Sequence, residues 1–219
     1  MMAPLPRTTT VLITPEQFIG FVSAALLITI SPGPDNLMVL SVGMSRGRRQ
    51  GMVFGLGCAL GCISHTVLAA LGVGALIMAS PLAFGALKVV GGAYLIWLGI
   101  GALRSRGGAR VDGAGVPDER LRKLFAKGLV ASVINPKVVL FFLSFLPQFV
   151  VAERGDASWQ TAQLGLLFTA QAVLVFGLLG YFSGTVGAWI NRHPGAGKWM
   201  DRLAGAIFVG LGLRLIVAR

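Results

Sequence analysis

Charged residues, and acidic residues above all, are scarce in this sequence. Only 12% of the 219 residues are charged, and only eight are Asp or Glu. A soluble domain carries about 25% charged residues, so this chain has about half the usual number with which to hydrate a surface. The composition therefore argues against an ordinary cytosolic enzyme, a solenoid or a disordered tail.

Cysteine is nearly missing, and so are the motifs of familiar catalytic and cofactor sites. Two cysteines cannot build a disulfide framework. The sequence holds no P-loop and no His-Glu-x-x-His pair, and the glycines of residues 55–61 have the wrong last spacing for a dinucleotide fingerprint. We therefore expect neither an enzyme nor a cofactor.

Hydrophobic residues, by contrast, make up 55% of the chain, and the mean hydropathy is +0.78. They gather in six stretches without strand-like alternation, each long enough to cross a bilayer as a helix. The stretches cover about residues 16–44, 51–79, 82–103, 128–151, 161–190 and 203–217. The sequence thus predicts an all-α integral membrane protein with six transmembrane helices in one domain, residues 1–219.

The distribution of Lys and Arg predicts an orientation in the membrane. Thirteen of the 19 basic residues lie between spans one and two, three and four, or five and six, and three lie on the opposite side. Because basic loops remain in the cytoplasm, we expect these loops to be cytoplasmic and both termini to lie outside. The net charge of +11 then reflects membrane orientation rather than nucleic-acid binding.

The two halves of the chain carry a weak repeat. In each half a proline beside one charge interrupts the first span, and a basic residue, a glycine and an aromatic residue open the third. The matching elements are Gly33-Pro34-Asp35 with Asn135-Pro136-Lys137, and Lys88-x2-Gly91-x2-Tyr94 with Arg202-x2-Gly205-x2-Phe208. Because each copy has an odd number of spans, the second copy starts on the opposite side of the membrane and is inverted relative to the first. The pattern therefore predicts a 3+3 inverted repeat. Its units are residues 14–103 and 128–218, joined by a basic linker, 104–127; chance similarity among apolar helices is the alternative.

Asp35 is the only acidic residue inside a predicted span. A carboxylate at mid-membrane costs on the order of 3 kcal/mol. Asp35 follows Pro32, Gly33 and Pro34, which break the helix and free main-chain groups beside it. We predict that Asp35 binds a proton or a substrate ammonium. Alternatively, the first span ends near Ile30 and Asp35 caps a separate re-entrant helix.

Lys137 is the counterpart of Asp35 in the fourth span, directly after Pro136. A lysine at that depth must pair, snorkel or lose its proton. We interpret it as a cation facing the same cavity as Asp35, with Asn36 and Asn135 as further substrate contacts; snorkelling to the cytoplasmic surface is the alternative. A zwitterionic amino acid suits such a site, because its carboxylate favours a lysine or a helix N-terminus and its ammonium favours Asp35.

Other polar residues lie within the predicted second and fifth spans. Cys58, Cys62 and His65 share one face of a helix and could together hold a transition metal. No carboxylate lies nearby in sequence, and glycines repeat every four residues there, a pattern that favours close helix packing. We therefore predict no metal site, and keep His65 as a cavity-lining group. Gln171 needs a partner at its depth, either in another helix or in the cavity.

Taken together, these motifs resemble the LysE/RhtB family of amino-acid exporters, in particular its homoserine/threonine-exporter branch. The resemblance spans about residues 14–217 and rests on residues 31–36 (Ser-Pro-Gly-Pro-Asp-Asn), 91–99, 135–137 (Asn-Pro-Lys), 141–149 and 210–215. It implies a bacterial inner-membrane secondary exporter of amino acids or close derivatives, driven by protons through alternating access. Efflux of a metal ion or another small solute is the alternative, since the wider superfamily includes metal exporters. The implied partners are the amino acid, protons and the bilayer; a homodimer is compatible with this assignment.

Overall fold

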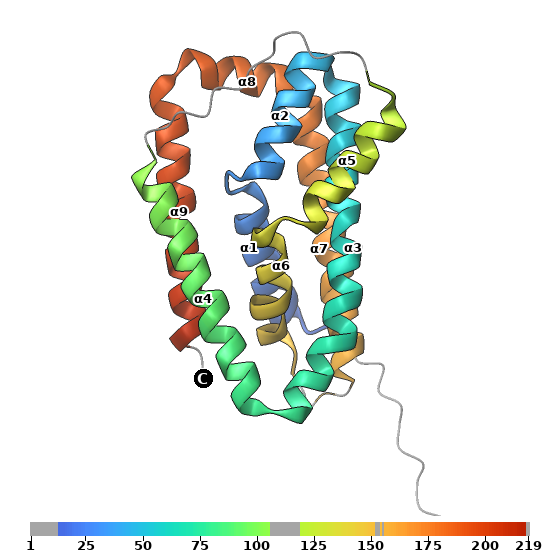
Figure 1. Cartoon of the computed structure of the whole chain (residues 1–219), viewed down its shortest axis with the longest axis vertical. Helices are drawn as coiled ribbons and strands as arrows, with labels where there is room; N and C mark the ends of the chain where they lie inside the picture. Colours follow the sequence, from blue (N-terminus) through green and yellow to red (C-terminus); the bar gives the residue numbers. More distant parts are fainter. Residues whose placement is uncertain (1–12, 106–118, 152–153, 155, 218–219) are drawn as a thin grey trace, which may run out of the picture.

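The computed structural model describes residues 13–105, 119–151, 154 and 156–217, and all regular secondary structure in these ranges is helical. The helices form an elongated bundle (Figure 1). Residues 106–118, the middle of the predicted linker, and the ends of the chain lie outside the described residues. The expectation of an all-α architecture is confirmed for the part of the chain that is described.

The first apolar stretch is two helices joined by a sharp bend. α1 (Pro15–Ile30) begins with a capping box, in which Thr14 and Gln17 satisfy each other's main-chain N–H groups. α2 (Pro34–Arg46) begins at a proline, which lacks an N–H and suits a first helical position. The two axes differ by 56°. The predicted break at residues 31–34 is therefore present.

The fourth stretch is broken in a similar way. α5 (Leu121–Val133) is followed by α6 (Pro136–Leu140), a π-helical segment η1 (Phe141–Phe145) and a 3₁₀ segment η2 (Leu146–Phe149). The bend at residues 134–135 is 49°. α5 starts before the predicted span, so residues 121–127, which we assigned to the linker, are helical and pack beside the bundle (Figure 1).

Four long helices and one short helix complete the described chain. They are α3 (Arg48–Ala79), α4 (Pro81–Arg104), α7 (Ala157–Tyr181), α8 (Ser183–Arg192) and α9 (Pro194–Val217). The fifth predicted span, 161–190, ends instead at Tyr181, and α8 crosses the upper end of the bundle (Figure 1).

The number of membrane spans follows from helix length and composition. α3, α4 and α7 each contain a stretch long and apolar enough to cross a membrane, and the two bent pairs raise the candidates to five. α9 is 24 residues long but is not among them, since its sequence includes Lys198, Asp201, Arg202 and Arg214. Leu71, Leu82 and Leu174 are among many exposed apolar side chains, as lipid contact requires. The chain is a multi-pass membrane protein.

Glycines bring the long helices close together. α3 packs along α7 on one face and along α5 on another, and α4 packs along α9. A Cβ at Gly55 would lie 2.9 Å from the Phe176 main-chain oxygen of α7. A Cβ at Gly57 would overlap the Phe125 oxygen of α5. The predicted small-residue surface of α3 is therefore used on two faces.

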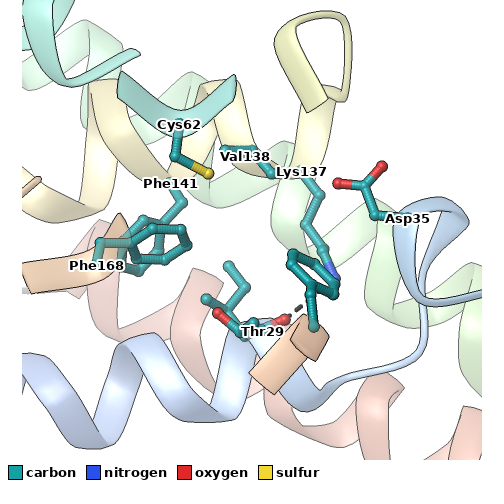
Figure 2. A pocket seen from close by; sticks show the side chains of 9 residues that line it. Thr29, Asp35, Cys62, Lys137, Val138, Phe141 and Phe168 are labelled. Carbon is teal, nitrogen blue, oxygen red and sulfur yellow. Dashed lines mark hydrogen bonds between the residues drawn. The ribbon is translucent and has the colours of Figure 1, made fainter. Parts of the chain in front are cut away.

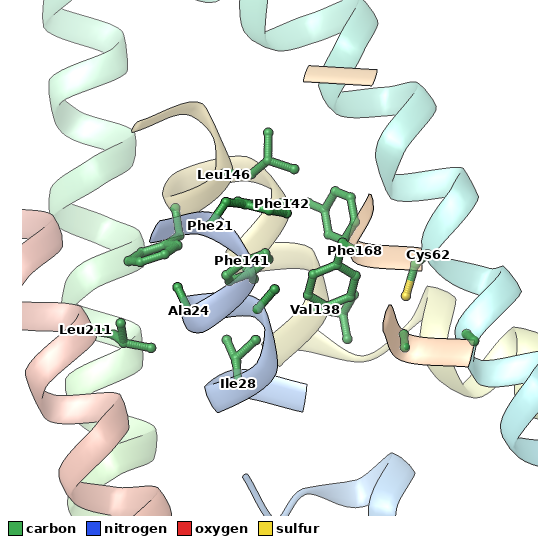
Figure 3. Packing of buried hydrophobic residues seen from close by; sticks show 14 of the residues in the cluster. Phe21, Ala24, Ile28, Cys62, Val138, Phe141, Phe142, Leu146, Phe168 and Leu211 are labelled. Carbon is green, nitrogen blue, oxygen red and sulfur yellow. The ribbon is translucent and has the colours of Figure 1, made fainter. Parts of the chain in front are cut away.

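Aromatic side chains fill the interior where the broken helices meet the long ones. Phe141 and Phe142 of η1 are fully buried, and both pack on Phe168 of α7 with ring centroids 5.0 Å apart (Figure 3). Phe21 of α1 packs on Phe141 at 6.0 Å. This cluster fixes the broken spans against α7 and so positions the polar groups at the two breaks.

Candidate functional site

Asp35 and Lys137 line one small cavity between the two broken spans (Figure 2). Thr29 and Cys62 also contribute polar atoms to its wall, and the remaining wall is apolar, including Phe141. The cavity measures about 20 Å³, which is room for about one water molecule. The structure thus places residues of opposite charge type, one from each half of the chain, around one small cavity.

Lys137 closes the end of α1. Its Nζ donates to the main-chain oxygens of Ile28 and Ser31, both at 3.1 Å. These carbonyls belong to the last turn of α1 and its cap, where a cation is favoured by the helix dipole. A Cβ at Gly33 would lie 2.8 Å from this Nζ. A side chain at position 33 would therefore require the Lys137 ammonium to move away from the break.

Asp35 lies in the first turn of α2, where a negative charge is favoured by the helix dipole. The residue is 3% exposed. No ion pair joins its carboxylate to Lys137, whose ammonium is turned toward the α1 carbonyls instead. Asp35 forms part of the cavity wall (Figure 2), and its carboxylate interacts with the Asn135 side chain.

Thr29 ties two further predicted residues to the first break. Asn36 Nδ2 donates to the Thr29 main-chain oxygen at 2.8 Å, and Gln171 Nε2 donates to Thr29 Oγ1 at 2.8 Å. The other amide oxygens, Asn36 Oδ1 and Gln171 Oε1, are buried without a hydrogen-bond donor in the described chain. Neither Asn36 nor Gln171 lines the small cavity. Gln171 thus has the interhelical partner that its depth requires.

The second break is held by groups from both halves of the chain. Asn135 Oδ1 accepts from the Lys137 main-chain N–H at 3.0 Å and caps α6. His65 Nε2 lies 3.2 Å from the Ser132 main-chain oxygen near the end of α5; since that oxygen only accepts, Nε2 carries the proton. His65 does not line the small cavity. Each break is thus closed by a nitrogen donor from the opposite half: Lys137 on α1 and His65 on α5.

Sequence reasoning found the charges but missed their partners. Pro34 and Pro136 begin α2 and α6 as predicted. Thr29 and Ser132 were missed, and each supplies acceptors just before a break. The only sequence feature that marks these two residues is that each has a small hydroxyl side chain near the end of an apolar run.

The two cysteines are buried on the side of α3 that faces the breaks. Cys62 Sγ lies 3.7 Å from Ser132 Oγ. Within the described ranges, no three His, Cys, Asp or Glu side chains are arranged to hold a metal ion.

An ion cluster that sequence reasoning also missed joins α2 to the start of α5. Glu119 Oε2 accepts from Arg46 Nη1 at 2.9 Å, and Glu119 Oε1 lies 3.0 Å from Lys123 Nζ and 2.8 Å from Lys127 Nζ. Hydrogen bonds from Lys127, Arg46 and Lys123 lower the pKa of Glu119 to about 2. The cluster lies at the end of the bundle that the basic loops share.

Comparisons with known proteins match this architecture to one family. The sequence model of the family described as LysE type translocator matches residues 26–219. The chain is 30% identical to the threonine efflux protein of Escherichia coli K12, across 92% of this chain and 98% of that protein. It is 31% identical to the leucine efflux protein of Enterobacter sp. strain 638, across 91% and 94%, and 28% identical to the homoserine/homoserine lactone efflux protein of Salmonella typhimurium LT2, across 93% and 98%. No solved structure is significantly similar to the chain.

Proposed function

Because the chain belongs to the LysE type translocator family, we propose that it is a secondary active exporter of amino acids or close derivatives across the bacterial inner membrane. Family membership indicates a transporter rather than an enzyme. Relatives of similar identity carry threonine, leucine and homoserine in their names, so similarity alone does not select the substrate.

The single observation that carries this proposal is the placement of Asp35 and Lys137 on one cavity between two broken spans. Keeping both charges inside a membrane protein is costly, and such residues usually mark a functional site. Asp35 forms no ion pair among the described residues, and its carboxylate interacts with the neutral Asn135 side chain, so a proton or a substrate ammonium can still bind there. Lys137 is held by two carbonyls and lies 5.8 Å from the centroid of the Phe208 ring. In the proposed mechanism its positive charge attracts a substrate carboxylate.

The proposed mechanism is alternating access driven by the proton gradient. A cavity of about 20 Å³ is far too small for an amino acid, so this conformation is closed at the site. Transport then requires the broken helices to part toward one side at a time. Protonation of Asp35 would release a bound ammonium, and deprotonation would restore the carboxylate for the next substrate. The hydrogen bonds at the two breaks keep the broken helices in position during this step; they are made by Asn36, Asn135, His65 and Gln171.

We place this mechanism on a six-span, 3+3 inverted repeat. In this scheme α1–α2 corresponds to α5–α6 with η1 and η2, α3 to α7, and α4 to α9. Two features support it: both bent pairs begin their second helix at a proline, and the corresponding partners α3 with α7 and α4 with α9 pack along each other. The basic loops would be cytoplasmic and both termini outside.

Efflux from loaded cells tests the function directly. Cells expressing the protein are loaded with a panel of amino acids, and efflux is followed with and without a proton uncoupler. We expect faster efflux of at least one amino acid than in cells lacking the protein, and loss of that difference with the uncoupler. Unchanged efflux of every amino acid would contradict the proposal, and metal tolerance that depends on Cys58 and Cys62 would favour metal efflux instead.

A further inference from the structure

The short helix α8 and the residues on either side of it form a surface that the proposed export mechanism does not use. α8 (Ser183–Arg192) crosses the end of the bundle, whereas α3 and α7 run along its length (Figure 1). Because the spans cross the bilayer, a helix laid across their end lies near the membrane surface. Residues 181–200, which include α8, contain no Asp or Glu. This part of the chain therefore carries no negative side chain.

One face of α8 is buried against α2. Ser183, Gly187 and Ile190 are the buried residues of α8. A Cβ at Gly187 would overlap the side chain of Met44, and a Cβ at Gly43 would overlap the side chain of Ser183. Small residues thus seat α8 directly on α2. The exposed residues of α8 therefore lie on the face that is turned away from the bundle.

This outward face continues the lipid-facing surface of the long helices. Leu174 and Leu178 of α7 are exposed, and Tyr181, at the end of the same helix, is exposed as well. Near the start of α9, Trp199 is exposed one turn before the exposed Leu203. The amphipathic rings of Tyr and Trp favour the headgroup level of a bilayer. We therefore expect the boundary between hydrocarbon and headgroups at the level of α8.

Exposed cations lie among these aromatic residues. Arg48 Nη1 donates to Tyr181 Oη at 3.4 Å, and Arg48 Cζ is 5.2 Å from the centroid of the Tyr181 ring, a distance at which a cation is attracted to a ring face. Arg192 is three residues from the exposed Trp189 on α8, and Lys198 is exposed near the start of α9. Neither Arg192 nor Lys198 forms an ion pair within the part of the chain that the structure describes. Their charges therefore remain for an anion.

We propose that the outward face of α8, together with Arg48, Arg192 and Lys198, binds the anionic headgroups of phospholipids in the adjoining leaflet. The three cationic groups contact the phosphates, the rings of Tyr181 and Trp189 lie at the headgroup level, and the acyl chains continue along the exposed leucines of α7. A soluble acidic protein would match the charges alone and would leave the adjoining apolar surface uncovered. A phospholipid matches both, since its headgroup is anionic and its chains are apolar.

Quenching of tryptophan fluorescence by brominated lipids tests this proposal on the full chain in vesicles. Trp189 is kept as the single tryptophan, and phenylalanine replaces the other three, Trp97, Trp159 and Trp199. Fluorescence is measured in mixtures of brominated phosphatidylglycerol with unlabelled phosphatidylcholine, and in mixtures with the label exchanged. We expect both lipids to quench Trp189. Phosphatidylglycerol should bind at least fivefold more strongly, because each cation at an anionic surface contributes a factor of roughly five.

Matched variants separate the cations from the position of α8. Replacing Arg48, Arg192 and Lys198 together by glutamine should reduce the preference for phosphatidylglycerol to less than twofold. Quenching by brominated phosphatidylcholine should persist in this variant, which shows that α8 is still seated at the membrane. Arg154→Gln is the control, because Arg154 is exposed and lies just before α7, at the other end of the bundle; it should keep the full preference.

Three results would overturn the proposal. They are equal binding of the two lipids by the single-tryptophan protein, an undiminished preference in the triple glutamine variant, and no quenching of Trp189 by either lipid, as expected if a protein or water covers α8. The experiment measures no flux. Its result is therefore independent of whether the chain exports amino acids.

Discussion

The ammonium of Lys137 donates to the main-chain oxygen of Ser31 at 3.1 Å. Ser31 ends the first half of one broken span, and Lys137 begins the second half of the other. The same nitrogen also reaches Ile28, so a single cation closes the C-terminal end of α1. The two breaks are therefore one connected structure rather than two independent kinks.

Replacing Lys137 should weaken the fold as well as the site. In Lys137→Met, the carbonyls of Ile28 and Ser31 lose their shared donor inside the protein. Each unsatisfied buried polar group costs about 1–3 kcal/mol, so for the two carbonyls we expect a free energy of unfolding lower by about 2–6 kcal/mol. Thermal unfolding of the purified protein in detergent measures this. Lys198→Met, at an exposed position, serves as the control; equal melting temperatures for the two variants would contradict the capping role.

The close approach of α3 to α5 should tolerate no side chain at Gly57. Because a Cβ there overlaps the Phe125 oxygen, Gly57→Ala must push the helices apart, and overpacking of this kind costs about 1–3 kcal/mol. Gly177→Ala in α7 is the matched control, because nothing lies within 4 Å of the added carbon. There alanine should stabilise the helix by up to about 1 kcal/mol. Melting temperatures that move in the same direction for both variants would argue against this packing.

The Glu119 cluster should make stability depend on pH in acid. The pKa of the Glu119 carboxyl is lowered from 4.5 to about 2 in the folded protein. As the pH falls, Glu119 therefore takes up its proton in the unfolded chain before it does so in the folded one. The stabilisation is complete above pH 4.5 and is lost between pH 4.5 and about 2. We expect the wild type to melt at a higher temperature than Glu119→Gln at pH 6, with a gap that narrows below pH 4.5. A gap that stays constant down to pH 3 would show that these ion pairs add nothing.

Local sequence chemistry was sufficient to predict the breaks and the charges. Pro34 and Pro136 cannot continue a preceding helix, so the bends follow from them directly. Asp35 and Lys137 stood out because ionisable groups inside apolar spans are costly. These effects depend on a few adjacent residues, which is why the sequence was informative.

The partners of these residues could not be predicted in the same way. Lys137 binds main-chain oxygens, which every residue possesses, so no side-chain pattern marks them. Glu119 meets Arg46 only because the end of α2 and the start of α5 lie side by side, and that is a property of the tertiary fold. The bend at Phe182 separates α8 from α7, and no proline at this position marks it in the sequence. The continuous apolar stretch therefore led us to predict α7 and α8 as one span.

The role of Asp35 is the claim on which the proposed mechanism depends. Asp35→Asn preserves the size of the side chain and removes the ionisable carboxylate, so the fold should survive while coupling is lost. Asp156→Asn is the control: Asp156 caps α7 at an exposed position by accepting from Ser158 and Trp159, and asparagine caps a helix equally well. Both variants should insert into the membrane in wild-type amounts.

Amino-acid flux driven by an imposed pH gradient in proteoliposomes is the most direct measurement. With equal amounts of inserted protein, we predict wild-type flux in Asp156→Asn and a decrease of at least tenfold, to the rate of protein-free vesicles, in Asp35→Asn. Wild-type flux in Asp35→Asn would contradict the account, because a neutral amide can neither exchange a proton at this pH nor pair with an ammonium as a carboxylate does.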